Sequence, residues 1–213
     1  MIIAAGFAAA VTAQAQTSVL SLADSPGQPY TQYVSSFTAT TSQTYLTFFF
    51  RQDPAYWGFD NVSFTDGNGN NLAANGSFET GDLTGWMAVG QQGLPAGGQV
   101  TSGDLGTSSY NAEDGSYFWR DGAVGGVDGV AQLVSTTVGQ NYTLSFWLAG
   151  DGGATASFDA YVGAAVSTYD GNTILYNGSQ ISGGGDVTPA PEPTTLALAG
   201  LGIAGLIAAR RRK

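Results

Sequence analysis

The sequence predicts an all-β fold, most simply a β-sandwich, from three observations. Glycine supplies 32 of the 213 residues and lysine is absent before Lys213, a composition that disfavours helices. Threonine, serine, tyrosine and phenylalanine gather in short alternating runs bounded by turn residues, as in strands. About 170 residues remain between the two terminal segments described below, enough for one ordinary domain. We therefore expect a single sandwich over residues 16–176.

The chain begins with an apolar stretch over residues 2–11, followed by Ala13-Gln14-Ala15. Small residues at these two positions fit cleavage by signal peptidase before Gln16, so residues 1–15 are predicted to be a signal peptide and the protein to be exported. No lysine or arginine precedes the apolar stretch. Either the true start codon lies upstream of Met1, or the amino terminus supplies the charge.

Three strands are predicted in the next part of the chain, over residues 33–39, 44–51 and 57–65. Both faces of the second are apolar or aromatic, so we expect it to be a central strand. Pro54 follows it and predicts a turn, because proline cannot donate to an interior ladder.

The segment Asn75-Gly-Ser-Phe-Glu79, followed by Gly81-Asp82 and Gly85-Trp86, resembles the opening of galactose-binding-like jelly rolls of the carbohydrate-binding-module type. Residues 132–148 are similar to the long central strand of those domains, and residues 57–64 to their closing strand. The resemblance implies a jelly-roll β-sandwich.

In the resembled domains the closing strand comes last, whereas here it comes first. Two interpretations are open. Residues 18–65 are the remnant of an upstream repeat, or the chain is a circular permutant in which the usual last strands lead. We favour permutation, because the strand signals after residue 169 are weak and a jelly roll without its last strands would expose open sheet edges.

The rest of the body is less regular. Residues 87–129 are rich in glycine, with one clear strand predicted over 114–120, and another strand is predicted over 157–162. Residues 177–193 have the glycine, serine and proline content of a linker.

The last part of the chain has three components in order. Prolines in the 188–193 segment predict an extended, exposed tether. An uncharged apolar run over residues 194–209 predicts a membrane helix, short for a bilayer that needs roughly 20 residues. The run ends in a basic cluster that is expected to stay cytoplasmic, Arg210, Arg211, Arg212 and Lys213.

Pro191, Glu192 and Pro193, the helix and the basic cluster together resemble the PEP-CTERM sorting tail of Gram-negative bacteria that make extracellular polysaccharide. The resemblance covers only this tail. It implies an exosortase-type membrane peptidase as partner, transient anchoring in the inner membrane, and a destination at the cell surface or in the extracellular matrix. The alternative is an ordinary anchor that stays attached.

Composition excludes several kinds of chemistry. The chain has no cysteine and no histidine, which removes disulfides, cysteine nucleophiles, Ser-His-Asp triads and zinc sites with thiolate or imidazole ligands. All 16 acidic residues precede the apolar run, whereas the body has only Arg51 and Arg120 as basic residues. Nucleic acid is therefore an unsuitable partner.

We expect the body to bind sugar, or to lie against a glycan matrix as a structural protein, without catalysis. Aromatic rings offer flat apolar surface to pyranose rings, and polar side chains bond hydroxyl groups. The candidates are Tyr56, Trp57, Trp119, Arg120 and, less strongly, Trp147. Core packing is the competing expectation for each tryptophan, and the stronger one for Trp86 and Trp147, which sit in strand-like patterns.

The alternative class is a secreted glycoside hydrolase, whose acid and base would come from Asp53, Glu79, Glu113 and Asp114. Glu113 and Asp114 are adjacent, and on a strand they would point to opposite faces, which disfavours this reading.

A structural Ca²⁺ is a further prediction. In the resembled domains the ion commonly lies near the junction of the opening and closing strands, and the resemblance implies Asp60 and Glu79 as ligands here. Calcium needs six to eight oxygens, so carbonyl groups and waters would complete the site.

Overall fold

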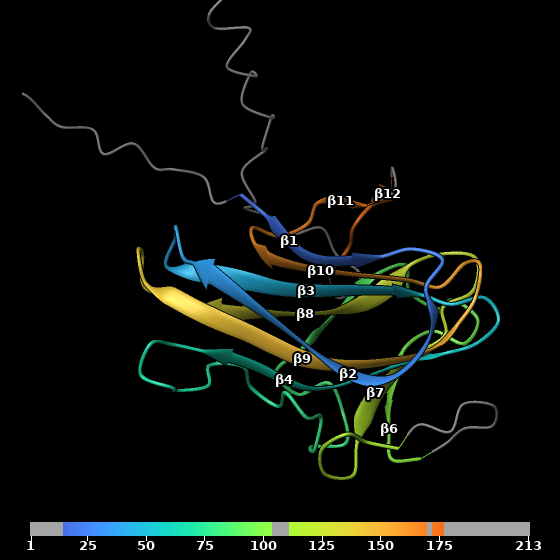
Figure 1. Cartoon of the computed structure of the whole chain (residues 1–213). Helices are drawn as coiled ribbons and strands as arrows, with labels where there is room; N and C mark the ends of the chain where they lie inside the picture. Colours follow the sequence, from blue (N-terminus) through green and yellow to red (C-terminus); the bar gives the residue numbers. More distant parts are fainter. Residues whose placement is uncertain (1–14, 104–110, 170–171, 177–213) are drawn as a thin grey trace, which may run out of the picture. The chain divides into compact units, whose positions relative to one another are not determined.

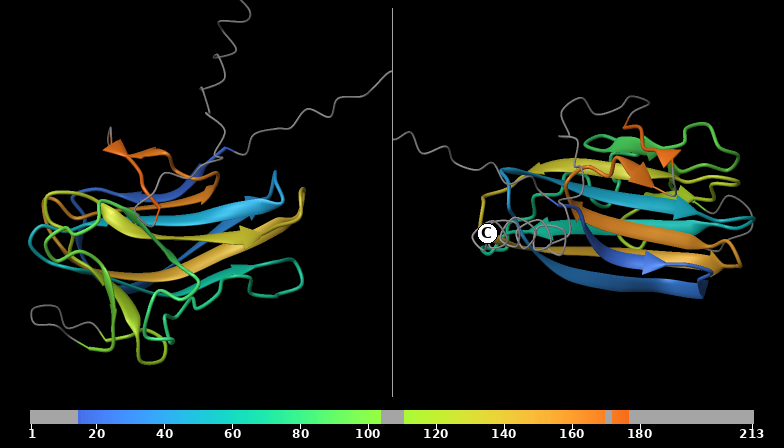
Figure 2. Two further views of the ribbon diagram at one scale, coloured as in Figure 1. Left: turned by 180° about the vertical axis from the view of Figure 1, so that it is seen from behind. Right: turned by 90° about the horizontal axis from the view of Figure 1, so that it is seen from above.

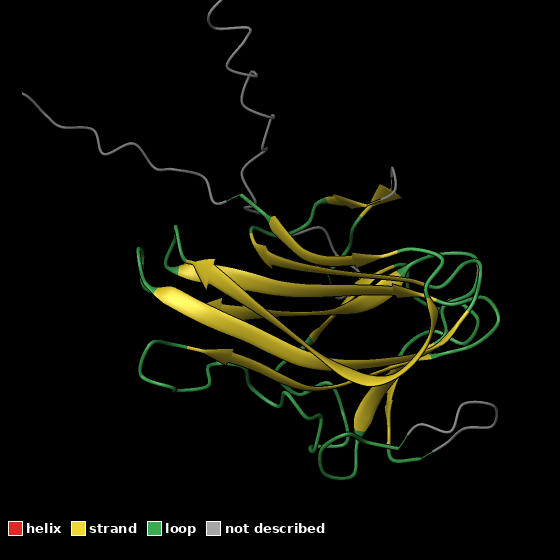
Figure 3. Ribbon diagram, viewed as in Figure 1, coloured by secondary structure: helices red, strands yellow, loops and turns green. Residues whose placement is uncertain are grey.

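The computed structural model describes residues 15–103, 111–169 and 172–176, which form two packed antiparallel β-sheets and contain no helix (Figures 1 and 3). The prediction of an all-β sandwich is confirmed. Within these residues no helix is long and apolar enough to cross a membrane. The predicted leader up to residue 14, the linker, the Pro191-Glu192-Pro193 motif, the apolar run and the basic cluster lie outside the described residues.

Sheet A has five strands in the order β1-β10-β3-β8-β5, and the right panel of Figure 2 shows strands of this sheet side by side from above. Its strands are β1 (Thr17–Leu22), β3 (Gln43–Arg51), β5 (Met87–Gly90), β8 (Asp128–Ser135) and β10 (Ser157–Gly163). The predicted central strand over residues 44–51 is β3, which pairs with β10 on one side and β8 on the other. Its central position is therefore confirmed.

Sheet B also has five strands, in the order β2-β9-β4-β7-β6. Its strands are β2 (Pro26–Thr38), β4 (Trp57–Thr65), β6 (Gln99–Thr101), β7 (Phe118–Asp121) and β9 (Asn141–Gly152). The short strands β11 (Thr168–Tyr169) and β12 (Asn172–Thr173) pair only with each other. The bounds predicted for β4 agree with the structure.

The strands that precede residue 66 belong to the same sandwich as the strands that follow. β3 lies in the middle of sheet A and β4 in the middle of sheet B, each between two strands from later in the chain. This pairing is what a permuted strand order requires. The two parts also meet at a bulge in β4, where the Val62 N–H donates to the Gly76 carbonyl (3.0 Å) and a Cβ at residue 76 would lie 1.9 Å from the Val62 carbonyl oxygen.

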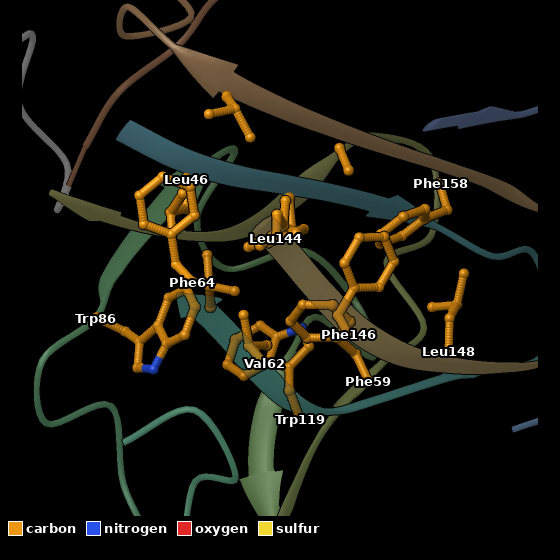
Figure 4. Close-up of a cluster of buried hydrophobic side chains, with 14 of the residues drawn as sticks. Leu46, Phe59, Val62, Phe64, Trp86, Trp119, Leu144, Phe146, Leu148 and Phe158 are labelled. Carbon is orange, nitrogen blue, oxygen red and sulfur yellow. The ribbon is translucent and has the colours of Figure 1, made fainter. Parts of the chain in front are cut away.

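Between the sheets lies a core dominated by aromatic rings (Figure 4). Phe48 from β3 is fully buried, and its ring lies 4.6 Å from that of Phe59 and 5.4 Å from that of Phe146, between ring centroids. Phe158 from β10 joins the same group. Alternation places one face of each strand in this core, which explains the aromatic and aliphatic residues at every second position of β3 and β9, and of β4 on either side of its bulge.

A smaller apolar cluster lies on the outer face of sheet A. Phe49, Val89 and Ala131 of the sheet are covered there by Val166, Ile174 and Tyr176 of the last described segment.

The strand predicted over residues 114–120 is shorter in the structure, since β7 begins only at Phe118. Residues 113–117 form a turn instead. The backbone N–H groups of this turn donate to the carboxylates of Asp60 and Glu79. No local sequence pattern predicts these hydrogen bonds, because their acceptors lie far away in the chain.

Candidate functional site

The structure places two of the predicted sugar-binding residues in the core. Trp57 has no exposed surface and donates from Nε1 to the Arg51 carbonyl (3.0 Å), and Trp119 is 3% exposed. Both residues point inward because they lie in register with core positions of sheet B, so neither ring can offer a face to a sugar. This corrects the expectation that a turn before Trp57 leaves its side chain exposed.

Tyr56 and Arg120 do come together, at the outer end of β4 and β7. The Arg120 guanidinium lies 4.1 Å from the centre of the Tyr56 ring, a cation–π geometry. Arg120 is only 7% exposed, whereas Tyr56 is partly exposed. Asp151 fixes the Tyr56 backbone, because its carboxylate accepts from the Tyr56 N–H (3.0 Å) and its N–H donates to the Tyr56 carbonyl (3.0 Å).

Beside Asp151 lies an open, shallow depression of about 340 Å³ between the ends of β2 and β9. Gly27, Gln28, Pro29, Gly150 and Asp151 line it. Gln28 is held in place, since its Nε2 donates to the Leu148 carbonyl (3.0 Å) and its Oε1 accepts from the Tyr33 hydroxyl (3.1 Å).

An uncharged band of side chains, here called the polar strip, runs from this end along the outer face of β2 and β9. Cross-strand pairs define it: Gln32 with Trp147, Val34 with Ser145, Ser36 with Thr143, and Thr38 with Asn141. Val34 is 63% exposed, and the Thr38 hydroxyl donates to the Asn141 Oδ1 (2.6 Å). The strip therefore offers hydroxyl, amide and apolar groups with no formal charge.

Trp147 is partly exposed on this strip, contrary to the expectation that it packs in the core. The expectation for Trp86 is confirmed, because Trp86 is 6% exposed and packs against Phe48 and Phe78. Both tryptophans sit in strand-like patterns, but Trp86 lies just before β5, whereas Trp147 lies within β9 and its register with the neighbouring strands turns it outward. A sequence signal for the strip does exist, namely the polar residues at every second position of β9.

The 113–117 turn packs over the outward side of β4, where Asp60 lies opposite Trp147. Asp60 has no exposed surface, and its Oδ2 accepts from the N–H groups of Glu113 (2.7 Å) and Asp114 (2.9 Å). Burial raises the pKa of Asp60 to about 7, although these backbone hydrogen bonds act in the opposite direction. The open part of this face is therefore the part formed by β2 and β9.

The predicted calcium ligands meet at this turn. Glu79 Oε1 accepts from the N–H groups of Ser116 (2.8 Å) and Tyr117 (2.7 Å), next to the N–H groups that Asp60 accepts. These carboxylate oxygens accept hydrogen bonds from backbone N–H groups, which supply the positive partial charge that a bound cation would otherwise supply. The described residues contain no group of three or more acidic, histidine or cysteine side chains placed to hold a metal ion. Calcium at Asp60 and Glu79 stays a prediction.

The other carboxylates considered for hydrolysis each have a structural partner. Asp53 forms an ion pair with Arg51 (3.0 Å), Glu113 accepts from the Asn61 side chain (2.9 Å), and Asp114 accepts from the Ser77 hydroxyl (2.8 Å). Glu113 and Asp114 lie in the turn and not on a strand, so the opposite-face argument does not apply to them.

Comparison with known families agrees with the two resemblances. Residues 70–189, more than half of the chain, match the model of a carbohydrate binding domain. The chain belongs to this carbohydrate-binding family. Residues 189–213 match the PEP-CTERM protein-sorting motif, which contains Pro191, Glu192 and Pro193. No curated protein and no solved structure matches the chain. The family match begins at residue 70, so the four strands β1 to β4 of this carbohydrate-binding sandwich come from sequence outside it.

Proposed function

We propose that this protein is exported, sorted through its PEP-CTERM tail, and binds an extracellular polysaccharide along the polar strip without catalysing its hydrolysis. The observation that carries the proposal is the position of Trp147, a partly exposed indole in the middle of an uncharged sheet face of a carbohydrate-binding domain. An indole of this kind can stack against a sugar ring, while amides and hydroxyls beside it bond the sugar's hydroxyl groups.

The layout of the strip suits an extended chain. Trp147 and the polar residues at every second position of β9, Ser145, Thr143 and Asn141, share its outer face, so the strip extends for about 20 Å at roughly 3.3 Å per residue. Gln32 lies across from Trp147 on β2. A glycan lying along β9 would therefore meet one aromatic stacking position and several hydrogen-bonding groups in sequence.

Charge favours a neutral polysaccharide over an acidic one. The chain has 16 acidic residues, and Arg51 and Arg120 are the only basic residues before the tail. Arg51 is paired with Asp53, and the Arg120 guanidinium lies on the Tyr56 ring. A polyanion would meet net repulsion with little cationic surface to offset it.

The sorting tail supports a place in the envelope. In the proposed sequence of events, an exosortase-type peptidase recognises Pro191-Glu192-Pro193 while the apolar run holds the protein transiently at the inner membrane. The sandwich is then released to the cell surface or matrix of a Gram-negative, polysaccharide-producing cell, where its ligand is abundant.

The test is retention of the purified full chain on the polysaccharide of its own producing cells and on neutral and acidic reference glycans. Trp147→Ala should weaken binding at least tenfold, about 1.4 kcal/mol, since aromatic anchors dominate such contacts. Leu133→Ala is the matched control, because Leu133 is 38% exposed and lies on the other sheet. Equal binding by Trp147→Ala and wild type would exclude the strip. Retention on no glycan would favour a structural matrix protein, and release of reducing sugar would favour a hydrolase.

A further inference from the structure

Two carboxyl groups lie deep between the sheets at one end of the sandwich. Asp121 is the last residue of β7 in sheet B and has no exposed surface, and Asp128 is the first residue of β8 in sheet A and is 8% exposed. The loop of residues 122–127 joins them and carries the chain from one sheet to the other. Neither residue belongs to the proposed glycan surface.

Both side chains lie against Gly98: its N–H donates to Asp128 Oδ2 (3.1 Å), and a Cβ at residue 98 would lie 2.5 Å from Asp121 Oδ2. The two carboxyl groups are therefore neighbours, and each acts on the ionisation of the other. An ionised carboxylate only accepts hydrogen bonds, so a contact between two carboxyl groups requires a proton on one of them. The other donors around the pair are Trp119 Nε1 (3.2 Å) and the N–H of Ala123 (3.0 Å) to Asp121, and the N–H of Gly98 (3.1 Å) to Asp128. Asp128 Oδ1 is buried and receives no donor from the described residues, which leaves this oxygen for the neighbouring carboxyl group.

Within the described residues, neither of the two basic side chains is directed at the pair. Arg120 and Asp121 are adjacent on β7, so they point to opposite faces of sheet B, and the Arg120 guanidinium lies over Tyr56. Arg51 is paired with Asp53. Two buried negative charges in direct contact would repel strongly, and a proton shared between them removes that repulsion. The surrounding N–H donors suit a single negative charge and would oppose a metal ion.

We propose that Asp121 and Asp128 share one proton in the folded protein, and that the resulting acid–carboxylate hydrogen bond is a pH-sensitive tie between the two sheets. The tie holds the end of the sandwich that carries Tyr56. The Gly122 N–H donates to the Ala96 carbonyl (3.0 Å), and a Cβ at residue 122 would lie 2.5 Å from the Tyr56 ring.

Loss of the shared proton is expected to weaken the contact between β7 and β8 at this end of the sandwich. Burial raises the pKa of Asp121 well above its ordinary range, and burial raises the pKa of Asp128 as well. The other charged or titratable groups at this end are Arg120, Tyr56, Asp53, which accepts from the Gly125 N–H (3.1 Å), and Asp151, which accepts from the Tyr56 N–H (3.0 Å). The positive charges of Arg120 and of Arg51, which is paired with Asp53, balance these two carboxylates, so the groups around the pair add no net charge.

The sign of the pH effect follows from linkage. The unfolded chain releases aspartate protons near pH 4, whereas the folded protein keeps the shared proton to higher pH. The shared proton therefore contributes its full stabilisation of the folded state below about pH 4. Above about pH 4 folding takes up this proton, which lowers the folding equilibrium constant tenfold for each pH unit, until the folded pair ionises.

The direct test is the ionisation state of the aspartates in the wild-type full chain, followed by carbon-13 NMR of the side-chain carboxyl groups. At pH 5.5 two aspartates should remain protonated, one from the pair and Asp60, whose pKa is about 7. Assignment of the carboxyl signals to residues separates the pair from Asp60. An Asp121–Asp128 pair with both groups ionised at pH 5.5 would overturn the proposal, and this measurement needs no variant to fold.

The second test is urea unfolding of Asp121→Asn between pH 4 and pH 9. The amide can donate to Asp128 without a titrating proton, so the tie remains and the tenfold-per-unit dependence from this pair should disappear. Asp60→Asn is the matched control, because it removes the other buried carboxyl group and should leave the dependence from the pair in place. An Asp121→Asn variant with the same pH dependence as wild type would contradict the shared proton.

Discussion

Replacing Phe48 by alanine tests whether the strands before residue 66 and those after it share one core. Phe48 lies on β3 and is fully buried. Its ring lies within 6.4 Å of the rings of Trp86, Phe146 and Phe158, all from after residue 66, as measured between centroids. Truncation of a buried phenylalanine costs about 3–5 kcal/mol. Four aromatic neighbours, counting Phe59, place Phe48 near the upper end of that range.

The assay is urea unfolding of the full chain followed by tryptophan fluorescence. With a slope of about 2 kcal/mol per M for a domain of this size, the midpoint should fall by about 2 M while the slope stays unchanged. Val34→Ala is the control, because Val34 is 63% exposed and its loss should change stability by less than about 0.5 kcal/mol. A loss below about 1.5 kcal/mol for Phe48→Ala, or two separate transitions, would show that the early strands are a separate unit.

Four further predictions concern the carboxylates and one glycine. Glu79→Ala should reduce the unfolding free energy by about 1 kcal/mol, because two N–H groups of the 113–117 turn lose the carboxylate oxygen that accepts from them; an unchanged urea midpoint would contradict this. If Glu79 and Asp60 also hold calcium, millimolar Ca²⁺ should raise the melting temperature and Glu79→Gln should abolish the response; the same melting curve with Ca²⁺ and with chelator would exclude the ion. Because the folded pKa of Asp60 is about 7 and its ordinary value is 3.8, stability should fall as pH rises between these values, and Asp60→Asn should make this part of the profile less steep. Gly129→Val should prevent folding, since a Cβ at residue 129 would lie 2.0 Å from the Phe48 carbonyl oxygen. A soluble Gly129→Val variant with a wild-type circular dichroism spectrum would argue against this close approach of the two strands.

Much of the architecture was accessible from local pattern. The glycine-rich, lysine-poor composition and the short alternating runs predict an all-β sandwich, and the apolar character of both faces of residues 44–51 predicts the central position of β3. The PEP-CTERM tail was equally accessible, because its three components are contiguous in the chain. Features of this kind depend on neighbours in sequence, and the sequence displays them directly.

The direction in which each tryptophan points was decided by tertiary structure. Trp57, Trp119 and Trp147 all lie in strands, yet two are core residues and one is on the surface. A shift of one residue in register exchanges the two faces of a strand, and register is set by partners far away in the chain. The sequence therefore indicated aromatic candidates but could not rank them by exposure.

The same physical reason applies to the carboxylates. The sequence determined that this protein is acidic, all-β and equipped with a sorting tail, because composition, periodicity and contiguous motifs are local properties. Only the tertiary structure brought Asp60 and Glu79 onto one turn and Asp121 against Asp128 across two sheets. Burial and the placement of hydrogen-bond donors decide whether a carboxyl group is a ligand, a turn anchor or a proton-sharing partner, and both are created by packing between distant segments.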